Sequence, residues 1–194
     1  MSRKLDYVVS GTSYMRFSNP GIAKDETNSQ IINMLIDKLV TDVHSHKFSM
    51  LYNGHTESSF GDRFTAYKDH VHEIHADSGG LQIVTQGMVI TDELKDKVYE
   101  NQAQWADVGM CFDEIPVILT GDRSDRNDTK ARFFDFENYE ELARKTGRNV
   151  KRQLEIFDKA DSKCKPYIIL QGNCVDTYLR WYELLMEEVP AEWH

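Results

Sequence analysis

The stretch TDELKDKVYENQAQWADVGMCF, residues 91–112, predicts a helix followed directly by a strand. Thr91 is a preferred helix N-cap residue, and the two acidic residues after it place negative charge where the helix dipole favours it. We expect this helix to run to about Trp105. The apolar run Val108–Phe112 then predicts a strand, so this stretch is a helix-to-strand step of an α/β fold.

Similar patterns occur on both sides of this step. Strands are predicted at Leu5–Ser10, Phe48–Tyr52, Val71–Ala76, Tyr167–Leu170 and, less regularly, Leu81–Thr85. Helices are predicted at residues 31–40 after a capping box at Thr27–Gln30, at Tyr139–Ala160 and at Asp176–Glu188. Alternating elements predict a parallel sheet, either open and doubly wound or part of a (β/α) barrel.

Two details of the C-terminal part are specific enough to test. The run YIIL at Tyr167–Leu170 suits a strand buried on both faces and opened by Pro166. The last helix is expected to be apolar on the side that carries Tyr178, Leu179, Tyr182, Leu185 and Met186.

The composition predicts one domain that spans residues 1–194. The chain has 40% hydrophobic and 28% charged residues, enough for one ordinary core, and its three cysteines are expected to be reduced thiols. A net charge of −9 argues against non-specific adhesion to nucleic acid or anionic lipid. With no apolar run of about 18 residues and no secretory leader pattern, we expect a cytoplasmic protein with no membrane contact.

Polar residues directly after three apolar runs are the candidate site. In both architectures, ligands bind beyond the carboxyl ends of the strands. The three segments are Asp77-Ser78-Gly79-Gly80-Leu81-Gln82, Asp113-Glu114-Ile115-Pro116 and Gln171-Gly172-Asn173. Glycines allow close backbone approach to a flat ligand, and carboxylate and amide groups can read the edge of a nucleobase. Taken singly, each acid could equally cap a turn or a helix.

These segments resemble the tRNA-guanine transglycosylase superfamily, which includes queuine tRNA-ribosyltransferases and phage and bacterial enzymes that insert 7-deazaguanines into DNA. The family carries Asp-Ser-Gly-Gly-aromatic-Gln, then Phe-Asp-Glu before a proline, then Gln-Gly-Gly. The corresponding residues here are Asp77 to Gln82, Phe112-Asp113-Glu114 with Pro116, and Gln171-Gly172. The resemblance runs from about Asp77 to the C-terminal helix.

The resemblance implies a (β/α)₈ barrel enzyme that exchanges a base through a covalent glycosyl-enzyme intermediate. Asp77 would be catalytic and handle a proton in the base pocket, beside Ser78, Gly79, Gly80 and Gln82. Asp113 would read the guanine amidine edge, and Gln171 with Gly172 the carbonyl edge. The implied partners are DNA or tRNA and a guanine or 7-deazaguanine base, in the host cytoplasm if the chain is phage-encoded.

Departures from the family pattern shape this expectation. Leu81 stands where the family has an aromatic, and Asn173 stands where it has a glycine. The family's nucleophile and zinc site lie in a later region, so we expect no zinc in this chain and a partial barrel of about five of eight strands. A second chain or further copy would cover the open edges. Because the zinc-bearing region is absent, DNA is slightly favoured over tRNA. A non-catalytic partner subunit that keeps the base pocket is the alternative.

Two other clusters predict less. Asp42-Val43-His44-Ser45-His46 has the form found in metal-dependent hydrolases, with His70, His72 and His75 as possible further ligands. His44 and His46 follow a helical pattern instead of a strand, so we predict no metal site. Basic residues fall into a mixed-charge loop at Arg123, Arg126, Lys130 and Arg132, which could guide a phosphate backbone, and an exposed helical face at Lys145, Arg148, Lys151 and Arg152.

Overall fold

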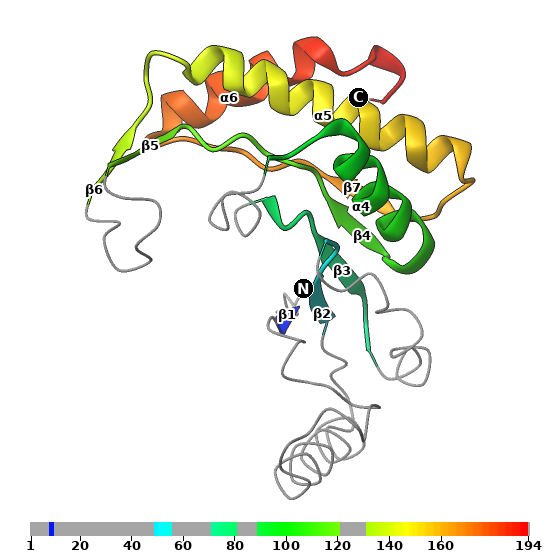
Figure 1. Cartoon of the computed structure of the whole chain (residues 1–194). Coiled ribbons are helices and arrows are strands. Elements are labelled where there is room, and N and C mark those ends of the chain that lie inside the picture. The colour runs from blue at the N-terminus through cyan, green and yellow to red at the C-terminus, as the bar shows by residue number, and fades with distance from the viewer. Residues whose placement is uncertain (1–7, 10–48, 56–70, 81–88, 121–130, 194) are drawn as a thin grey trace, which may run out of the picture.

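The computed structural model describes residues 8–9, 49–55, 71–80, 89–120 and 131–193 (Figure 1). Their strands are β1 (Val8–Val9), β2 (Ser49–Asn53), β3 (Ile74–Asp77), β4 (Val108–Met110), β5 (Val117–Thr120), β6 (Ala131–Phe134) and β7 (Lys165–Tyr167). Their helices are α4 (Asp92–Trp105), α5 (Tyr139–Lys159), α6 (Val175–Glu188) and the short 3₁₀ helix η2 (Ala191–Trp193).

A parallel sheet organises the described part of the chain. Its strand order is β1-β2-β3-β4-β7, and every neighbouring pair is parallel. Strands β5 and β6 form a separate antiparallel pair between β4 and α5, and Figure 1 shows it projecting away from the sheet. The mixed α/β class with a parallel sheet is confirmed.

The helix-to-strand step at residues 91–112 is confirmed. Thr91 is the N-cap of α4, and its Oγ1 accepts a hydrogen bond from the backbone N–H of Leu94 at 3.3 Å. The helix ends at Trp105, and β4 follows after two residues. Strand β2 and helix α5 also lie within one or two residues of their predicted bounds. The expected helix at 31–40 and the candidate strand at Leu81–Thr85 lie outside the described residues.

Strand β7 differs from its prediction in both position and burial. It spans Lys165–Tyr167, not Tyr167–Leu170, and all three of its residues are exposed. Among the described strands β7 pairs with β4 alone, so its second edge is open there. Pro166 lies inside the strand, and the N–H that it lacks would point away from β4, which leaves the ladder intact.

The buried side of helix α6 matches the predicted one only in part. Trp181, Leu184 and Leu185 are fully buried against α5, and the rings of Trp181 and Tyr139 lie 5.3 Å apart. Of the predicted apolar side, Leu185 is buried and Met186 is partly buried, whereas Tyr178, Leu179 and Tyr182 are exposed. The helix is apolar on two sides, and only contact with α5 selects which side is buried.

The described residues form two hydrophobic core clusters. One joins β2 and β3 to α4 through residues such as Met50, Tyr52 and Val98. The other lies between α5 and α6 and contains Leu154 and Trp181. Cys111 and Cys164 are buried, Cys174 is exposed, and all three are free.

Two buried glutamines connect the helices to the sheet. Gln102 of α4 donates hydrogen bonds to the carbonyl oxygens of Ala76 at 3.3 Å and Met110 at 2.9 Å. Gln153 of α5 donates to Gln102 Oε1 at 2.8 Å and to the carbonyl oxygen of Gly109 at 3.0 Å. A Cβ at Gly109 would lie 2.8 Å from Gln102 Oε1, so only glycine leaves space for this pair.

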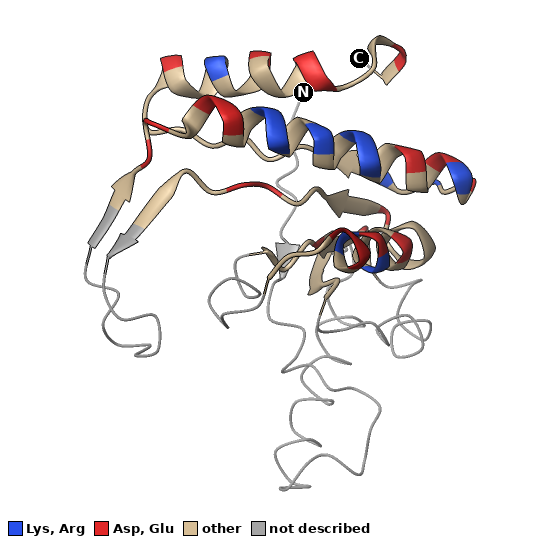
Figure 2. Cartoon of the chain, turned by 45° about the horizontal axis from the view of Figure 1, so that its top comes forward, with Lys and Arg blue, Asp and Glu red and all other residues tan. Residues whose placement is uncertain are grey.

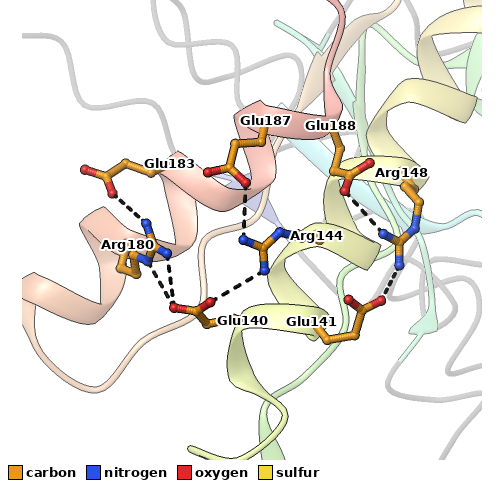
Figure 3. Close-up of polar contacts among 8 residues, drawn as sticks. All are labelled: Glu140, Glu141, Arg144, Arg148, Arg180, Glu183, Glu187 and Glu188. Atoms are coloured by element: carbon orange, nitrogen blue, oxygen red, sulfur yellow. Dashed lines mark hydrogen bonds and ion pairs between the residues drawn. The ribbon is translucent and has the colours of Figure 1, made fainter.

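Ion pairs cover the solvent side of α5 and α6. Along α5 acidic residues lie in the first turn, basic residues in the middle, and both signs in the last turns, as Figure 2 shows. Arg144 contacts Glu140 and Glu187, and Arg148 contacts Glu141 and Glu188 (Figure 3). Each exposed pair contributes little stability, but together they neutralise the basic residues of this surface. No helix in the described ranges is long and apolar enough to cross a membrane.

The close crossing of α5 and α6 gives a prediction for Gly147. A Cβ there would lie 2.8 Å from Glu188 Cβ and closer still to the Leu185 carbonyl oxygen. Helix propensity favours alanine by about 1 kcal/mol, yet we expect Gly147→Ala to reduce the free energy of unfolding by about 1–3 kcal/mol through overpacking. Urea denaturation measures this. The exposed α5 substitution Lys151→Ala should change it by less than about 0.5 kcal/mol, and a stabilised Gly147→Ala would contradict the crossing.

Candidate functional site

Three of the predicted residues lie at the carboxyl ends of neighbouring strands. Asp77 is the last residue of β3, Asp113 follows β4, and Gln171 follows β7. Because these strands are parallel, their carboxyl ends share one edge of the sheet. Gln171 Nε2 donates a hydrogen bond of 2.6 Å to Asp113 Oδ2. The structure therefore joins two of the predicted site residues directly.

The Asp113 carboxylate is electrostatically unfavourable where it lies. Burial raises its pKa, the hydrogen bond from Gln171 opposes this, and the charges of Asp77 and Glu114 raise it further. Lys145 forms an ion pair with Glu114 at 3.0 Å. Since the charge of Asp77 contributes to the pKa of Asp113, the two carboxylates interact across the edge of the sheet.

Asp77 begins a tight turn that brings backbone N–H groups to its carboxylate. Burial raises the pKa of Asp77, while hydrogen bonds from the backbone of Gly79 and Ser78 act in the opposite direction. Ser78 is buried, and its Oγ accepts a hydrogen bond from the Gly80 N–H at 3.3 Å. Gly79 has φ +74°, a conformation that favours glycine. The first glycine of the Asp-Ser-Gly-Gly segment thus has a specific backbone reason, whereas a Cβ at Gly80 would make only ordinary contacts, the nearest at 3.5 Å from Phe112 Cδ1.

The segment after β2 belongs to the same edge, and the sequence analysis did not identify it. Asn53 is opposite Asp77 in the parallel register, and the Gly54 N–H donates to the Asp77 carbonyl oxygen at 2.9 Å. A Cβ at Gly79 would lie only 2.6 Å from Asn53 Oδ1. The pattern that identified Asp77 also occurs here, because Asn53 and Gly54 follow an apolar run just as Asp77 does.

Gly172 packs against the start of α6. A Cβ there would lie 2.9 Å from both Thr177 Oγ1 and the Tyr178 backbone nitrogen. Thr177 Oγ1 also accepts hydrogen bonds from the N–H groups of Asn173 at 2.9 Å and Cys174 at 3.0 Å. These contacts hold the loop that carries Gln171, so Gly172 has a structural reason beside its predicted role in binding.

The remaining candidates are less informative. Leu81, Gln82, His44, His46 and His70 lie outside the described residues, as do Arg123, Arg126 and Lys130. His72 is exposed, whereas His75 is buried and contacts Glu73 at 3.2 Å. Within the described ranges no group of three or more His, Cys, Asp or Glu side chains is placed to hold a metal ion.

Lys145 and the arginines on α5 are used in internal pairs. Lys145 contacts Glu114, Arg148 contacts two glutamates, and Arg152 contacts Asp92 and Asp96. This agrees with the interpretation of an exposed charged face and provides no unpaired arginine of α5 for a phosphate backbone.

The chain was compared with protein-family models, with curated proteins and with solved structures, and none of them matched.

The raised pKa values of Asp77 and Asp113 predict how stability depends on pH. A folded-state pKa above the unfolded value gives stability that is present in acid and is lost as pH rises through the folded pKa. We therefore expect Asp77→Asn and Asp113→Asn to increase the free energy of unfolding at neutral pH. The gain should disappear below about pH 3.9, the ordinary Asp pKa.

Urea denaturation at neutral pH and at a pH below the ordinary Asp pKa tests this expected pH dependence. Asp135→Asn serves as a contrast. Hydrogen bonds from Asn138 lower the pKa of Asp135, so removing that carboxylate should reduce stability at neutral pH. A loss of stability at neutral pH in both Asp77→Asn and Asp113→Asn would mean that burial does not disfavour the two carboxylates.

Proposed function

We propose that this chain acts in a base-exchange glycosyltransferase that replaces guanine in a nucleic acid by a 7-deazaguanine. The observation that carries the proposal is the hydrogen bond between Gln171 and Asp113 beside Asp77 at the carboxyl edge of a parallel sheet. These residues come from segments far apart in the sequence, and each stands at the motif position that the transglycosylase resemblance assigns to the base pocket.

A (β/α) barrel is the architecture that fits this proposal. The described parallel strands follow one another in chain order, β1-β2-β3-β4-β7. A doubly wound sheet reverses its strand order at the switch point, whereas a barrel adds each new strand on the same side. The order of the described strands supports a partial barrel that has about five of the eight strands of a complete one.

The chemistry of the three groups suits guanine. A carboxylate accepts hydrogen bonds only, so Asp113 can bind the two N–H donors of the guanine amidine edge. The Gln171 amide can donate to a carbonyl oxygen such as that of guanine. Burial raises the pKa of Asp77, and a raised pKa suits a carboxyl group that takes up and releases a proton.

A second polypeptide is part of the proposal. Strand β7 has an open edge among the described strands, and α6 exposes Val175, Tyr178, Leu179 and Tyr182. An open strand edge and an exposed apolar helix face are features that proteins normally cover. The alternative function, a non-catalytic partner subunit that retains the base pocket, is favoured by the same exposed surfaces.

Base binding tests the proposal most directly. Isothermal titration should detect guanine binding, with hypoxanthine at least about tenfold weaker because it lacks one donor for Asp113. Asp113→Asn should weaken guanine binding by about 10- to 100-fold, since a hydrogen bond to a charged group contributes about 1.5–3 kcal/mol.

Asp176→Asn is the matched control, because Asp176 is an exposed acid in the first turn of α6. It should bind guanine like the unmodified chain. Equal binding of guanine and hypoxanthine would contradict the role of Asp113. Incorporation of labelled guanine into DNA and into tRNA then separates a catalytic chain from a non-catalytic partner that only binds the base.

A further inference from the structure

A buried lysine lies behind the candidate site and has no role in the proposed chemistry. Lys95 of α4 is only 6% exposed, and its Nζ donates to Asn149 Oδ1 at 2.8 Å. Asp92, the nearest paired acid, is 3.8 Å away. Burial lowers the pKa of Lys95, which expresses the cost of placing an ammonium group here. Such a cost calls for a compensating interaction.

The lysine determines the orientation of a buried amide. Asn149 is 4% exposed, and its Nδ2 donates to the Phe112 carbonyl oxygen at 2.9 Å and to Glu114 Oε1 at 3.4 Å. The Lys95 ammonium group can only donate hydrogen bonds, so the oxygen of the Asn149 amide, and not its nitrogen, must face it. The amide nitrogen must then face Phe112.

The backbone from Phe112 to Glu114 is held at two further groups. The Phe112 N–H donates to Tyr99 Oη at 3.1 Å, and the Glu114 N–H donates to Thr146 Oγ1 at 2.9 Å. The residues on both sides of Asp113 are therefore fixed from α4 and α5. The Asp113 side chain extends to Gln171 from a backbone that these helices hold.

We propose that Lys95 and Asn149 are positioning residues that fix the Phe112–Glu114 segment and thereby aim the Asp113 carboxylate at the base. The inference rests on the proposed function, because reading a base is the task that a precise direction of Asp113 would serve. A side chain that must meet two donors of a planar ligand has to be held to a fraction of an ångström.

Two substitutions separate this role from simple stabilisation. Asn149→Asp keeps an oxygen for Lys95 but turns a second oxygen toward the Phe112 carbonyl, so an attraction becomes a repulsion. Lys95→Met keeps the length of the side chain and removes the donor, which frees the Asn149 amide to rotate. Ser162→Ala is the matched control, since Ser162 Oγ donates to the Ala103 carbonyl oxygen at 2.7 Å and accepts from the Cys164 N–H at 3.1 Å.

The readouts do not need catalysis. Amide exchange at Phe112 and Glu114 should become at least tenfold faster relative to global unfolding, and guanine binding should weaken by at least tenfold. Ser162→Ala should change none of these.

Unchanged amide exchange at Phe112 and Glu114 in both variants would overturn the inference. Equal changes in Ser162→Ala would overturn it as well, because they would indicate general loosening. If the unmodified chain binds no guanine, the proposed function fails, but the exchange rates still decide whether Lys95 and Asn149 hold the backbone on both sides of Asp113.

Discussion

The rest of the structure depends on the buried amide pair between Gln102 and Gln153. The pair reaches carbonyl oxygens of β3 and β4 from two different helices, and it occupies the space that a side chain at Gly109 would take. Buried polar groups are costly without partners, so these hydrogen bonds favour one depth and one orientation of α4 and α5 on the sheet. The positions of the side chains that α4 and α5 place behind the candidate site follow from this constraint.

The carboxyl edge of the sheet combines this rigid support with unfavourable charge. Burial raises the pKa of both Asp77 and Asp113, and each lies at a strand end where the backbone is held by neighbours. A carboxylate kept in such a place reduces stability at neutral pH, which is typical of groups retained for binding or proton transfer. In contrast, the acids on the solvent side of α5 and α6 are paired with arginines and carry no such cost (Figure 3).

Local sequence patterns were sufficient where the interactions are themselves local. The cap at Thr91, the helix after it and the strand after that helix were predictable, because capping and periodicity involve residues a few positions apart. The strand-end rule also identified Asp77, Asp113 and Gln171 from polar residues that follow apolar runs. It could equally have identified Asn53, the last residue of β2, as Asp77 is the last residue of β3.

Tertiary structure decided what depends on partners distant in sequence. The run YIIL has the composition of a buried strand, but β7 begins earlier and is exposed because among the described strands only β4 pairs with it. Helix α6 is apolar on two sides, and the packing of Trp181 against Tyr139 selected one of them. Neither the bond from Gln171 to Asp113 nor the contact of Lys95 with Asn149 has a local signature, since 58 and 54 positions separate the partners. The sequence alone determined which groups stand at the strand ends, and only the parallel register of the strands brought them together.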